Sequence, residues 1–565
     1  MRLFQLQILQ GSYYYNIAES NRTQYFHIPA PRGRIFDRHG TKLTGNQPQY
    51  TLFVSIMNIT EQEKKEIAQG LGNITDFKPE YITGRFSKGE RLPFGNIRLL
   101  ANLTREEVKI IEENIHNFPR LSVQIEPRRE YPYGPNGSHL LGHIGEINKD
   151  ELTNLRKYGY RMGDKVGKIG LEEKYDRSLR GEAGFQKLEV GVKGEHKEIL
   201  KNVEPRIGND IVLSIDWDLQ QAAWEAMKDK DGAVVAMDPK TGELLVWISK
   251  PGFNPEDFSL PLAADKAREI FMDPTSPLFN RIIQGQYEPG SIFKLVTAIA
   301  ALDKGKATPE TEFTCRGSIE VGYDRRVFRC WQEREHGEIQ LAEAIARSCN
   351  VYFYQLGLNT GIEDIGQTAL QLGFSQPSQN IFTREATGNI PSPRWKQNRF
   401  SQSWYPGDTV NTSVGQGYVL VNTMQVLKLT SLIATKGEFT EPHISKMEIS
   451  PGGKVIRQIS PPETGKVDMN PDIFDIVNRA MTEVTEYGTA SFLNMPFPVG
   501  AKTGTAQNPG GDDHAWFTCF APAEDPQIAI TVFIERGGYG AVGAMPVARQ
   551  ILNEKFLNNG EHSLE

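Results

Sequence analysis

The chain has 565 residues and a formal net charge of −7 at neutral pH, a length sufficient for two to four domains, one of them with a large core. This charge gives no electrostatic reason to expect nucleic acid as a partner, and a total of four cysteines excludes a disulfide-rich scaffold. No run of about 18 apolar residues occurs, so we expect either a soluble protein or one whose membrane anchor lies upstream of residue 1.

The chain up to about residue 205 predicts helices and strands but contains no catalytic motif. Residues 1–30 are polar and predicted to be helical, and they end in the linker signal Pro29-Ala30-Pro31. A strand is expected at 50–56. Two helices should follow, each with a capping box at its start: Thr60 with Glu63, and Thr104 with Glu107.

From about residue 206 the pattern is that of one large α+β domain. Strands are predicted at 211–216, in a hairpin over 232–248, and at 499–507, 515–520 and 527–534. We expect them to form one antiparallel sheet, with the helices between 219 and 440 packed on its faces.

One long connection, residues 375–413, is rich in Ser, Pro, Asn and Gly. It carries Trp395, Trp404 and Tyr405, and a loop without regular structure is predicted. Two interpretations stay open. Either the loop is functional, or its tryptophans only pin it to the core.

The stretch Tyr287-Glu288-Pro289-Gly290-Ser291-Ile292-Phe293-Lys294 precedes an apolar run that reaches Leu302. Pro289-Gly290 should break the chain, so Ser291 is expected to open a buried helix, where backbone N–H groups lack partners. Lys294 lies three residues later on the same helix face, and burial should lower the pKa of its amine until it can act as a base. The pair is a candidate activated nucleophile, although Ser-x-x-Lys is expected by chance about once or twice in such a chain.

Two further motifs follow in the sequence. Ser348-Cys349-Asn350 comes after a helical pattern at 341–346, and Lys502-Thr503-Gly504-Thr505 lies in the strand predicted at 499–507. The serine of the Ser-x-x-Lys motif and the serine of the Ser-x-Asn motif are 57 residues apart. The Lys-Thr-Gly motif begins 154 residues after the serine of the Ser-x-Asn motif. The three motifs in this order resemble those of penicillin-binding proteins and serine β-lactamases.

The resemblance implies acyl transfer, with a role for each matching residue. Ser291 would be the nucleophile and Lys294 its base. Ser348 would hydrogen-bond between Lys294 and Lys502 and pass a proton to the leaving amine, while Asn350 would bind the substrate amide and steady Lys294. Lys502 would supply the positive charge that keeps Lys294 neutral and attracts the substrate's terminal carboxylate.

The same resemblance gives the strand of the third motif a binding role. The hydroxyls of Thr503 and Thr505 would bind the carboxylate. Gly504, without a side chain, would let the substrate approach and pair with the strand. The backbone N–H groups of Ser291 and Thr505 would form the oxyanion hole.

Other segments resemble class B penicillin-binding proteins, and a β-lactamase would leave the N-terminal half unexplained. The pedestal of class B proteins is matched by Arg32-Gly33-x-Ile35-x-Asp37-Arg38-x-Gly40 and Arg129-x-Tyr131-Pro132-x-Gly134. Two segments of the C-terminal half also resemble class B proteins: Gly415-Gln416-Gly417 and His514-Ala515-Trp516-Phe517. Two segments resemble the penicillin-binding protein 2 group of rod elongation: residues 287–294, and Trp404-Tyr405-Pro406-Gly407-Asp408. We therefore expect a juxtamembrane segment at 1–30, a non-catalytic pedestal at 31–205 and a transpeptidase domain at 206–565.

The resemblance implies a peptidoglycan D,D-transpeptidase that cross-links stem peptides during cell elongation and is inhibited covalently by β-lactams. It also implies a lipid-linked glycan, a polytopic SEDS-type glycosyltransferase and an elongation scaffold protein as partners. The expected location is the bacterial inner membrane, with a periplasmic catalytic domain and an anchor missing from this chain; no organic cofactor is expected. Two alternatives stay open: an idle fold that regulates a glycosyltransferase, and a β-lactam-hydrolysing or sensing homologue.

Three cysteines and a histidine gather near the second motif: Cys315, Cys330, His336 and Cys349. Three thiols and an imidazole are a complete set for tetrahedral zinc, although the spacing is loose for a zinc finger. Zinc would pin the second motif to the loop at 315–336, and some proteins of the resembled group hold zinc near this motif, often with carboxylate ligands. A Cys315–Cys330 disulfide and ordinary buried thiols are the competing interpretations. Cys519 is interpreted as a plain core residue.

Overall fold

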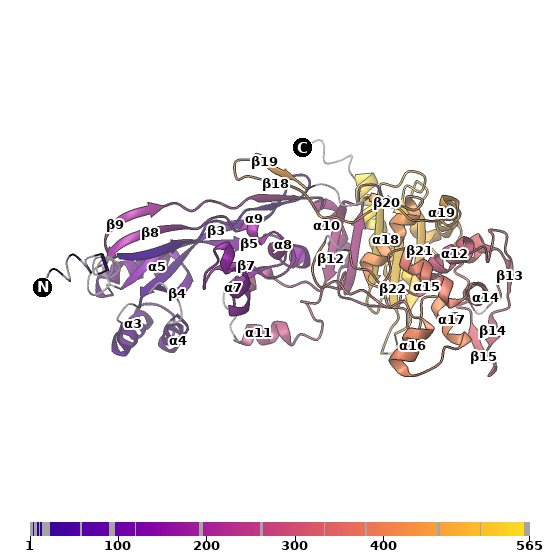
Figure 1. Ribbon diagram of the computed structural model, residues 1–565, viewed down its shortest axis with the longest axis horizontal. Helices are drawn as coiled ribbons and strands as arrows, with labels where there is room; N and C mark the ends of the chain where they lie inside the picture. The colour runs from indigo at the N-terminus through magenta and orange to yellow at the C-terminus, as the bar shows by residue number, and fades with distance from the viewer. Residues whose placement is uncertain are drawn as a thin grey trace.

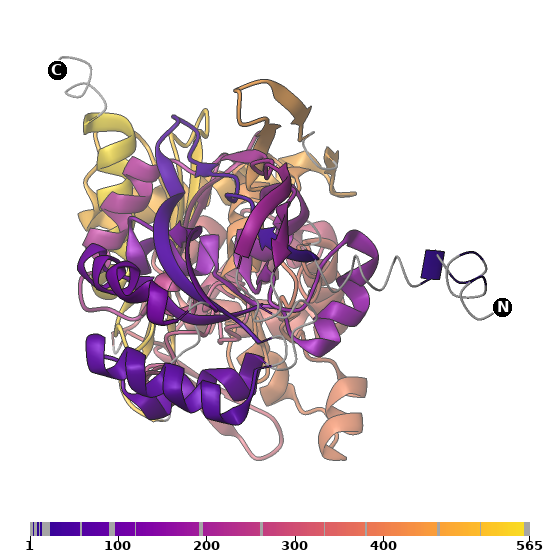
Figure 2. The same cartoon turned by 90° about the vertical axis from the view of Figure 1, so that its left-hand side faces the viewer.

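The computed structural model describes residues 23–558 except 57–58, 90–95, 119, 191–195, 260–263, 333, 379–380, 460–463 and 509, together with residues 4, 8, 10, 12 and 13. The molecule is elongated, with a narrow N-terminal part and a thicker C-terminal part (Figure 1). Seen from the N-terminal end, the first part lies in front of the second (Figure 2). Among the helices of the described ranges, none combines the length and the apolar character of a membrane span.

The narrow part is built on one long strand, β3 (Lys42–Ser55). β4 (Asn96–Leu103) and β5 (Leu121–Glu130) pair with it in antiparallel fashion. Apolar side chains of these strands and of three helices form one core: α3 (Glu61–Ile74), α4 (Pro79–Gly89) and α5 (Arg105–Asn114). The capping boxes predicted at Thr60 and Thr104 are both present.

A second sheet of three strands runs along the narrow part: β1 (Thr23–Ile28), β8 (Gly184–Val190) and β9 (His196–Val203). The prediction of a helix reaching residue 30 is therefore wrong for residues 23–28. Tyr25, Phe26 and Ile28 have high strand propensity, and pairing with β8 far along the chain decides their conformation. Most of the predicted helix before residue 23 lies outside the described residues.

A buried ion cluster contains the first arginine of each of the two pedestal motifs, Arg32 and Arg129. Glu172, in α8 (Gly170–Lys174), is fully buried and accepts hydrogen bonds from Nε of Arg32 and of Arg129 at 2.5 and 2.7 Å. Arg32 also pairs with Asp176 at 2.7 Å. Because each charge has a partner from another segment, removing one would leave another buried without compensation.

One sheet joins the two parts of the molecule, in the order β19-β18-β10-β2-β3-β4, with β5 also paired with β3. The joint consists of four short strands: β2 (Ile35–Phe36), β10 (Asp210–Leu213), β18 (Ser445–Ile449) and β19 (Val455–Gln458). The prediction that the strand at 211–216 belongs to the catalytic sheet is therefore wrong. The Asp210 carboxylate binds the Arg34 guanidinium at 2.7 Å, which ties this strand to the narrow part.

The thicker part contains a five-stranded antiparallel sheet, as predicted for the other strands. Its order is β12 (Leu244–Lys250), β11 (Gly232–Met237), β23 (Ile528–Ile534), β22 (His514–Ala521) and β21 (Gly500–Ala506). Helices α10 (Trp217–Met227) and α21 (Met545–Asn553) pack on one face, and α18 (Thr423–Ala434) and α19 (Pro471–Glu486) on the other. β21 is an edge strand, so one side of its backbone is available to a neighbour.

A helical layer beside β21 carries the other two motifs. It contains α12 (Lys294–Asp303), α13 (Leu341–Ala346), α14 (Asn350–Thr360) and α15 (Ile362–Gln371). The remaining short elements are β6 (Ile144–Glu146), β7 (Lys165–Gly167), α6 (Ser138–Leu141), α7 (Lys149–Leu155), α9 (Asp176–Leu179), α11 (Ala264–Phe271), β13 (Phe313–Cys315), β14 (Ser318–Val321), β15 (Arg326–Arg329), β16 (Gly337–Ile339), β17 (Glu438–Thr440), β20 (Thr464–Lys466) and α20 (Gly540–Gly543).

The long loop predicted at 375–413 contains two helices, α16 (Pro393–Phe400) and α17 (Pro406–Ser413), so that prediction is wrong for its second half. Each helix has proline in its first turn, where the missing N–H costs nothing. The two tryptophans of this segment contact residues nearby in the sequence. The Trp395 ring lies against Tyr418, and Trp404 donates from its indole to the Thr409 hydroxyl at 2.9 Å. These contacts fit the interpretation in which the tryptophans pin the segment.

Candidate active site and metal cluster

Ser291 lies in the tight 3₁₀ turn that runs directly into α12. Gly290 has a φ of +53°, and a Cβ added there would lie 2.4 Å from the carbonyl oxygen of Thr505. A Cβ added at Gly504 would lie 2.9 Å from the carbonyl oxygen of Pro289. The two glycines thus allow the turn to pack directly on β21, and Ser291 lies beside Thr505.

Lys294, the first residue of α12, is fully buried one turn after Ser291. Its Nζ donates to the Ser348 carbonyl oxygen at 2.7 Å, to Ser348 Oγ at 3.2 Å and to Asn350 Oδ1 at 2.7 Å. The second motif therefore holds the amine in one position.

Ser348 connects the two lysines of the site. Its Oγ lies 3.2 Å from Lys294 Nζ and 3.0 Å from Lys502 Nζ. Lys502 Nζ also donates to the carbonyl oxygen of Thr503 at 2.9 Å. Ser348 has a φ of +54°, in the left-handed region that costs energy for a residue with a side chain, and such strain gathers at functional sites. The hydroxyl is thus held where it can pass a proton between the amines.

Burial lowers the pKa of both lysine amines. The pKa of Lys294 falls to about 8 because its ammonium form loses hydration. The pKa of Lys502 falls well below its usual value, since loss of hydration and then the charge of Lys294 both disfavour its protonated form. The amines therefore favour one shared proton over two. Which amine holds that proton stays a prediction, in which Lys502 carries the charge and Lys294 is the neutral base.

The edge strand supplies the rest of the candidate site. The Thr503 hydroxyl is hydrogen-bonded to the Thr489 hydroxyl at 2.8 Å, and Thr505 is half-buried. The Ser291 N–H, at the start of a helix, has no backbone acceptor among the described residues. It lies next to the backbone of Thr505, which faces the same turn. The role of these two N–H groups as an oxyanion hole stays a prediction.

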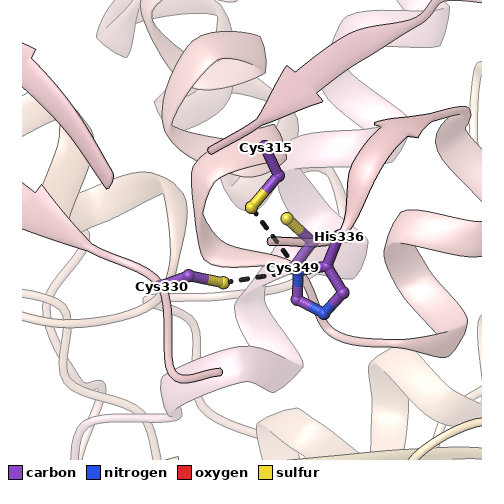
Figure 3. A group of neighbouring side chains, drawn as sticks. All are labelled: Cys315, Cys330, His336 and Cys349. Atoms are coloured by element: carbon purple, nitrogen blue, oxygen red, sulfur yellow. Dashed lines mark hydrogen bonds between the residues drawn. The ribbon is translucent and has the colours of Figure 1, made fainter. Parts of the chain in front are cut away.

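The four predicted metal ligands also lie together. Cys315 ends β13, and Cys330 directly follows β15. His336 directly precedes β16, and Cys349 is the N-cap of α14. One ligand atom from each lies within 4.8 Å of all the others. Figure 3 shows the three sulfur atoms gathered around the imidazole.

The spacing of this cluster fits tetrahedral zinc. Sγ of Cys315 and of Cys330 lie 3.5 and 3.7 Å from Nδ1 of His336, and zinc with bonds of about 2.3 Å to sulfur and about 2.0 Å to nitrogen spaces such atoms about 3.6 Å apart. A hydrogen bond from Cys349 lowers the pKa of the Cys330 thiol and raises that of Cys349, so one thiolate is favoured in the cluster. No pair of cysteines forms a disulfide in the structure, which contradicts the alternative of a Cys315–Cys330 disulfide.

Two family models match the chain. The penicillin-binding protein dimerisation domain matches residues 27–213, and the penicillin-binding protein transpeptidase domain matches residues 232–553, more than half of the chain. The chain belongs to the class B penicillin-binding proteins. It is 30% identical to the peptidoglycan D,D-transpeptidase MrdA of Escherichia coli K12 over 100% of this chain and 92% of that protein.

Solved structures place this penicillin-binding protein in the same group. The complex between the penicillin-binding protein PBP2 and MreC from Helicobacter pylori matches with a TM-score of 0.84 and 29% identity, over 95% of this chain and 100% of that one. A second match is a structure of a peptidoglycan synthase complex that coordinates polymerization and crosslinking. Its TM-score is 0.73 and its identity 30%, over 98% of this chain and 95% of that one. The predicted membership of the penicillin-binding protein 2 group and the α+β fold class are confirmed.

The structure of this penicillin-binding protein brings the side chains of Lys294, Ser348, Asn350 and Lys502 into direct contact, as the motifs predicted. Their catalytic roles stay predictions. The structure gives Gly504 a second reason besides the predicted approach of substrate, which stays a prediction. A side chain there would meet Pro289 of the nucleophile turn, whereas the prediction concerned only the approach of substrate.

Two residues beside the site were not predicted from the sequence. Thr489 holds the Thr503 hydroxyl from the segment after α19, and a single threonine in that position carries no sequence signal. Glu288 precedes the nucleophile turn, and burial raises the pKa of its carboxyl to about 7 while the Gly417 N–H partly offsets this. Cys519, interpreted as a core residue, is fully buried in β22, and burial raises its pKa.

Proposed function

We propose that this protein is a peptidoglycan D,D-transpeptidase that cross-links stem peptides through an acyl-enzyme on Ser291 and releases D-alanine. The observation that carries the proposal is the Ser348 hydroxyl, 3.0 Å from the Lys502 amine and 3.2 Å from the Lys294 amine. Both amines are buried with lowered pKa values, and Lys294 lies one helical turn after Ser291. The family description, a penicillin-binding transpeptidase domain, and the activity named for the Escherichia coli relative support the same reaction.

In the acylation step, Ser291 Oγ attacks the carbonyl carbon of the penultimate D-alanine, and its proton passes to the neutral amine of Lys294. The carbonyl oxygen becomes an oxyanion that accepts hydrogen bonds from the N–H groups of Ser291 and Thr505. The C–N bond then breaks as Ser348 delivers a proton to the leaving nitrogen, so that terminal D-alanine departs as an amine. The Ser348 proton is replaced from the adjacent lysine.

Cross-linking reverses these proton movements. An amine of a neighbouring stem peptide attacks the ester carbonyl and gives its proton to the same lysine and hydroxyl chain. The bond to Ser291 Oγ breaks, and Oγ takes back a proton. Before release of D-alanine, the hydroxyls of Thr503 and Thr505 would bind the terminal carboxylate, with Thr503 oriented by Thr489.

Labelling with a fluorescent penicillin tests this function. The native protein should keep the label through a denaturing gel, because the label is bound by an ester, and Ser291→Ala should lose it. The matched control is Ser413→Ala, since Ser413 is a buried serine whose hydroxyl bonds to the Val410 carbonyl at 2.7 Å and takes no part in the proposed chemistry. Equal labelling of native protein and Ser291→Ala would contradict the proposal.

The two alternatives predict different results in the same assay. A β-lactam-hydrolysing homologue would acquire the label and lose it within minutes, whereas a transpeptidase should retain it. An idle regulatory fold would not be labelled at all. The ordered contacts of both lysines with Ser348 support an active enzyme over the idle fold.

The partners and the location follow from the relatives. We infer that the protein acts in cell elongation at the bacterial inner membrane, with its catalytic part in the periplasm. We further infer that its narrow part contacts a scaffold protein of the MreC type and that a glycosyltransferase of the SEDS type supplies the glycan. The MreC complex of the Helicobacter pylori protein and the synthase complex support these inferences. Co-purification from membranes with both partners would test them.

We also propose a structural zinc ion bound by Cys315, Cys330, His336 and Cys349. Zinc would supply a fixed link between the 315–336 segment and Ser348-Cys349-Asn350, because Cys349 lies between the two motif residues that contact Lys294. Elemental analysis should find about one zinc per chain in the native protein and almost none in Cys315→Ser. Absence of stoichiometric zinc from the native protein would remove this proposal.

A further inference from the structure

Two neighbouring short helices form a surface that the proposed acylation chemistry does not use. Residues 401–405 join α16 to α17, and we call the whole segment 393–413 the aromatic hairpin. Its tryptophans hold the segment in place, as described above. Two of its other aromatic rings are exposed to solvent, those of Phe400 by 45% and of Tyr405 by 61%. Exposed large rings in a well-ordered segment indicate a binding surface.

Both exposed rings are supported from inside the protein. The Phe400 ring packs against the ring of Tyr418, with centres 5.4 Å apart and planes inclined by 30°. Lys396 is buried, and its Nζ lies 5.2 Å from the centre of the Tyr405 ring and 2.6 Å from a carboxylate oxygen of Asp408. The exposed parts of the rings are therefore presented in a fixed arrangement, which lowers the entropy lost when a ligand binds.

The polar side chains around the rings suit an uncharged polyol. Exposed amide side chains that make no hydrogen bond within the described part of the chain belong to Gln397, Asn398 and Gln402. The only carboxylate of residues 393–413, that of Asp408, is already paired. A pyranose ring has a face of C–H groups that packs on an aromatic ring, and its hydroxyl and acetamido groups can exchange hydrogen bonds with amides. This combination of side chains therefore favours a sugar polymer.

The aromatic hairpin is continuous with the nucleophile turn. α17 leads from Tyr405 to Gly415, whose carbonyl oxygen accepts a hydrogen bond from the Gly290 N–H at 3.0 Å. The 8 residues of this helix span about 12 Å. A stem peptide of about four residues spans about 14 Å when extended. A substrate whose D-alanyl end reaches Ser291 therefore has its glycan at about the distance of the exposed rings.

We propose that the aromatic hairpin binds the glycan of peptidoglycan, a polymer of N-acetylated amino sugars, and so positions the stem peptide at Ser291. This inference rests on the proposed transpeptidase function and adds a site for the polysaccharide. Arg394 and Arg399 are exposed, and their charge suits the carboxylates of stem peptides on the same polymer. Aromatic and basic side chains also suit a membrane surface. Figure 1 places α16 at the far end of the molecule from the N-terminus, the end expected near the membrane, which favours the glycan.

The test measures binding of the full chain to fluorescently labelled glycan strands whose stem peptides an amidase has removed. We expect saturable binding and an affinity weaker by about fivefold or more in Tyr405→Ala, which loses the stacking ring. Tyr405→Phe keeps the ring and should stay within about twofold of native. The matched control is Tyr81→Ala, because Tyr81 is also exposed, by 55%, and stacks on Phe77 in the narrow part. This control should stay within about twofold as well.

Phe400→Ala guards against a folding defect at the start of α17, because Phe400 lies in α16. It should weaken strand binding to a similar extent as Tyr405→Ala, with an unchanged circular dichroism spectrum. Ser291→Ala should bind the strands as tightly as native protein, since strands without peptides do not need the nucleophile. Strand binding and penicillin labelling therefore fail separately, which distinguishes this proposal from the proposed function.

Three outcomes would overturn the proposal. The first is absence of saturable binding to the strands. The second is equal affinity in native protein, Tyr405→Ala and Phe400→Ala, or equal weakening by Tyr405→Ala and Tyr81→Ala, because exposed rings anywhere on the surface would then contribute alike. The third uses anionic lipid vesicles as a second probe: weaker binding of Tyr405→Ala to vesicles but not to strands would identify a membrane contact instead.

Discussion

The pKa of Lys294 determines how the acylation rate depends on pH. The proposed base is the neutral amine, so the rate should rise with pH as the amine loses its proton. With a pKa of about 8, the neutral fraction is about 10% at pH 7 and about 90% at pH 9, a rise of about tenfold that then levels off. A lysine at its usual 10.5 would give a rise of about a hundredfold over the same range, without a plateau.

The assay is the second-order rate constant of fluorescent penicillin labelling between pH 6 and about 9.5 at constant ionic strength. The variant Asn350→Asp makes this assay more specific for Lys294. A carboxylate would then replace the amide oxygen that lies 2.7 Å from Lys294 Nζ, and the opposite charge should raise the pKa and move the midpoint to higher pH. A flat profile, a hundredfold rise without a plateau, or a midpoint that Asn350→Asp leaves unchanged would refute this reasoning.

Three substitutions test other parts of the structure. Glu172→Ala leaves two buried arginines without their shared carboxylate and should lower the free energy of unfolding by about 3–5 kcal/mol, measured by chemical denaturation; a change below about 1 kcal/mol would contradict the described cluster. Gly504→Ala places a methyl group 2.9 Å from the carbonyl oxygen of Pro289 and should slow penicillin labelling at least about tenfold while the protein stays folded; an unchanged rate would show that the turn has room to move. Thr489→Val frees the Thr503 hydroxyl and should raise the KM for a D-alanyl-D-alanine peptide by about tenfold with little change in kcat; a fall in kcat alone would argue against a role in orienting the binding residue.

The motif residues and the catalytic sheet could be predicted because their signals are local. Three short motifs, recognised by their resemblance to those of penicillin-binding proteins, indicated Ser291, Lys294, Ser348, Asn350 and Lys502. Continuous apolar runs bounded by turn residues indicated β11, β12, β22 and β23, which are buried except for the last residue of β12 and the first residue of β22. The capping boxes at α3 and α5 are also local, since each joins residues three apart.

The errors occur where distant segments decide the structure. Residues 23–28 form a strand because β8, far along the chain, pairs with them. β10 leaves the catalytic sheet because β2 and β18 lie on either side of it. No pattern within either segment contains that information. The helices α16 and α17 were missed for another reason: their polar sequences lack an apolar period, and caps and prolines at their starts define them.

The electrostatic details of the site were also beyond the sequence. The motifs named two lysines, but the lowering of both pKa values follows from their burial in the fold. The contact of Thr489 with the Thr503 hydroxyl could not be predicted either, because it depends on how the fold places the two residues. The metal cluster was suggested by residue types alone, and the convergence of its four side chains is a property of the fold.

The most direct test of the account is a crystal structure of the protein after reaction with a β-lactam. The account predicts electron density that continues from Oγ of Ser291 into the opened antibiotic, with the ester oxygen between the N–H groups of Ser291 and Thr505. Density joined to another residue, or an intact antibiotic without a covalent bond, would contradict the assignment of Ser291 as the nucleophile.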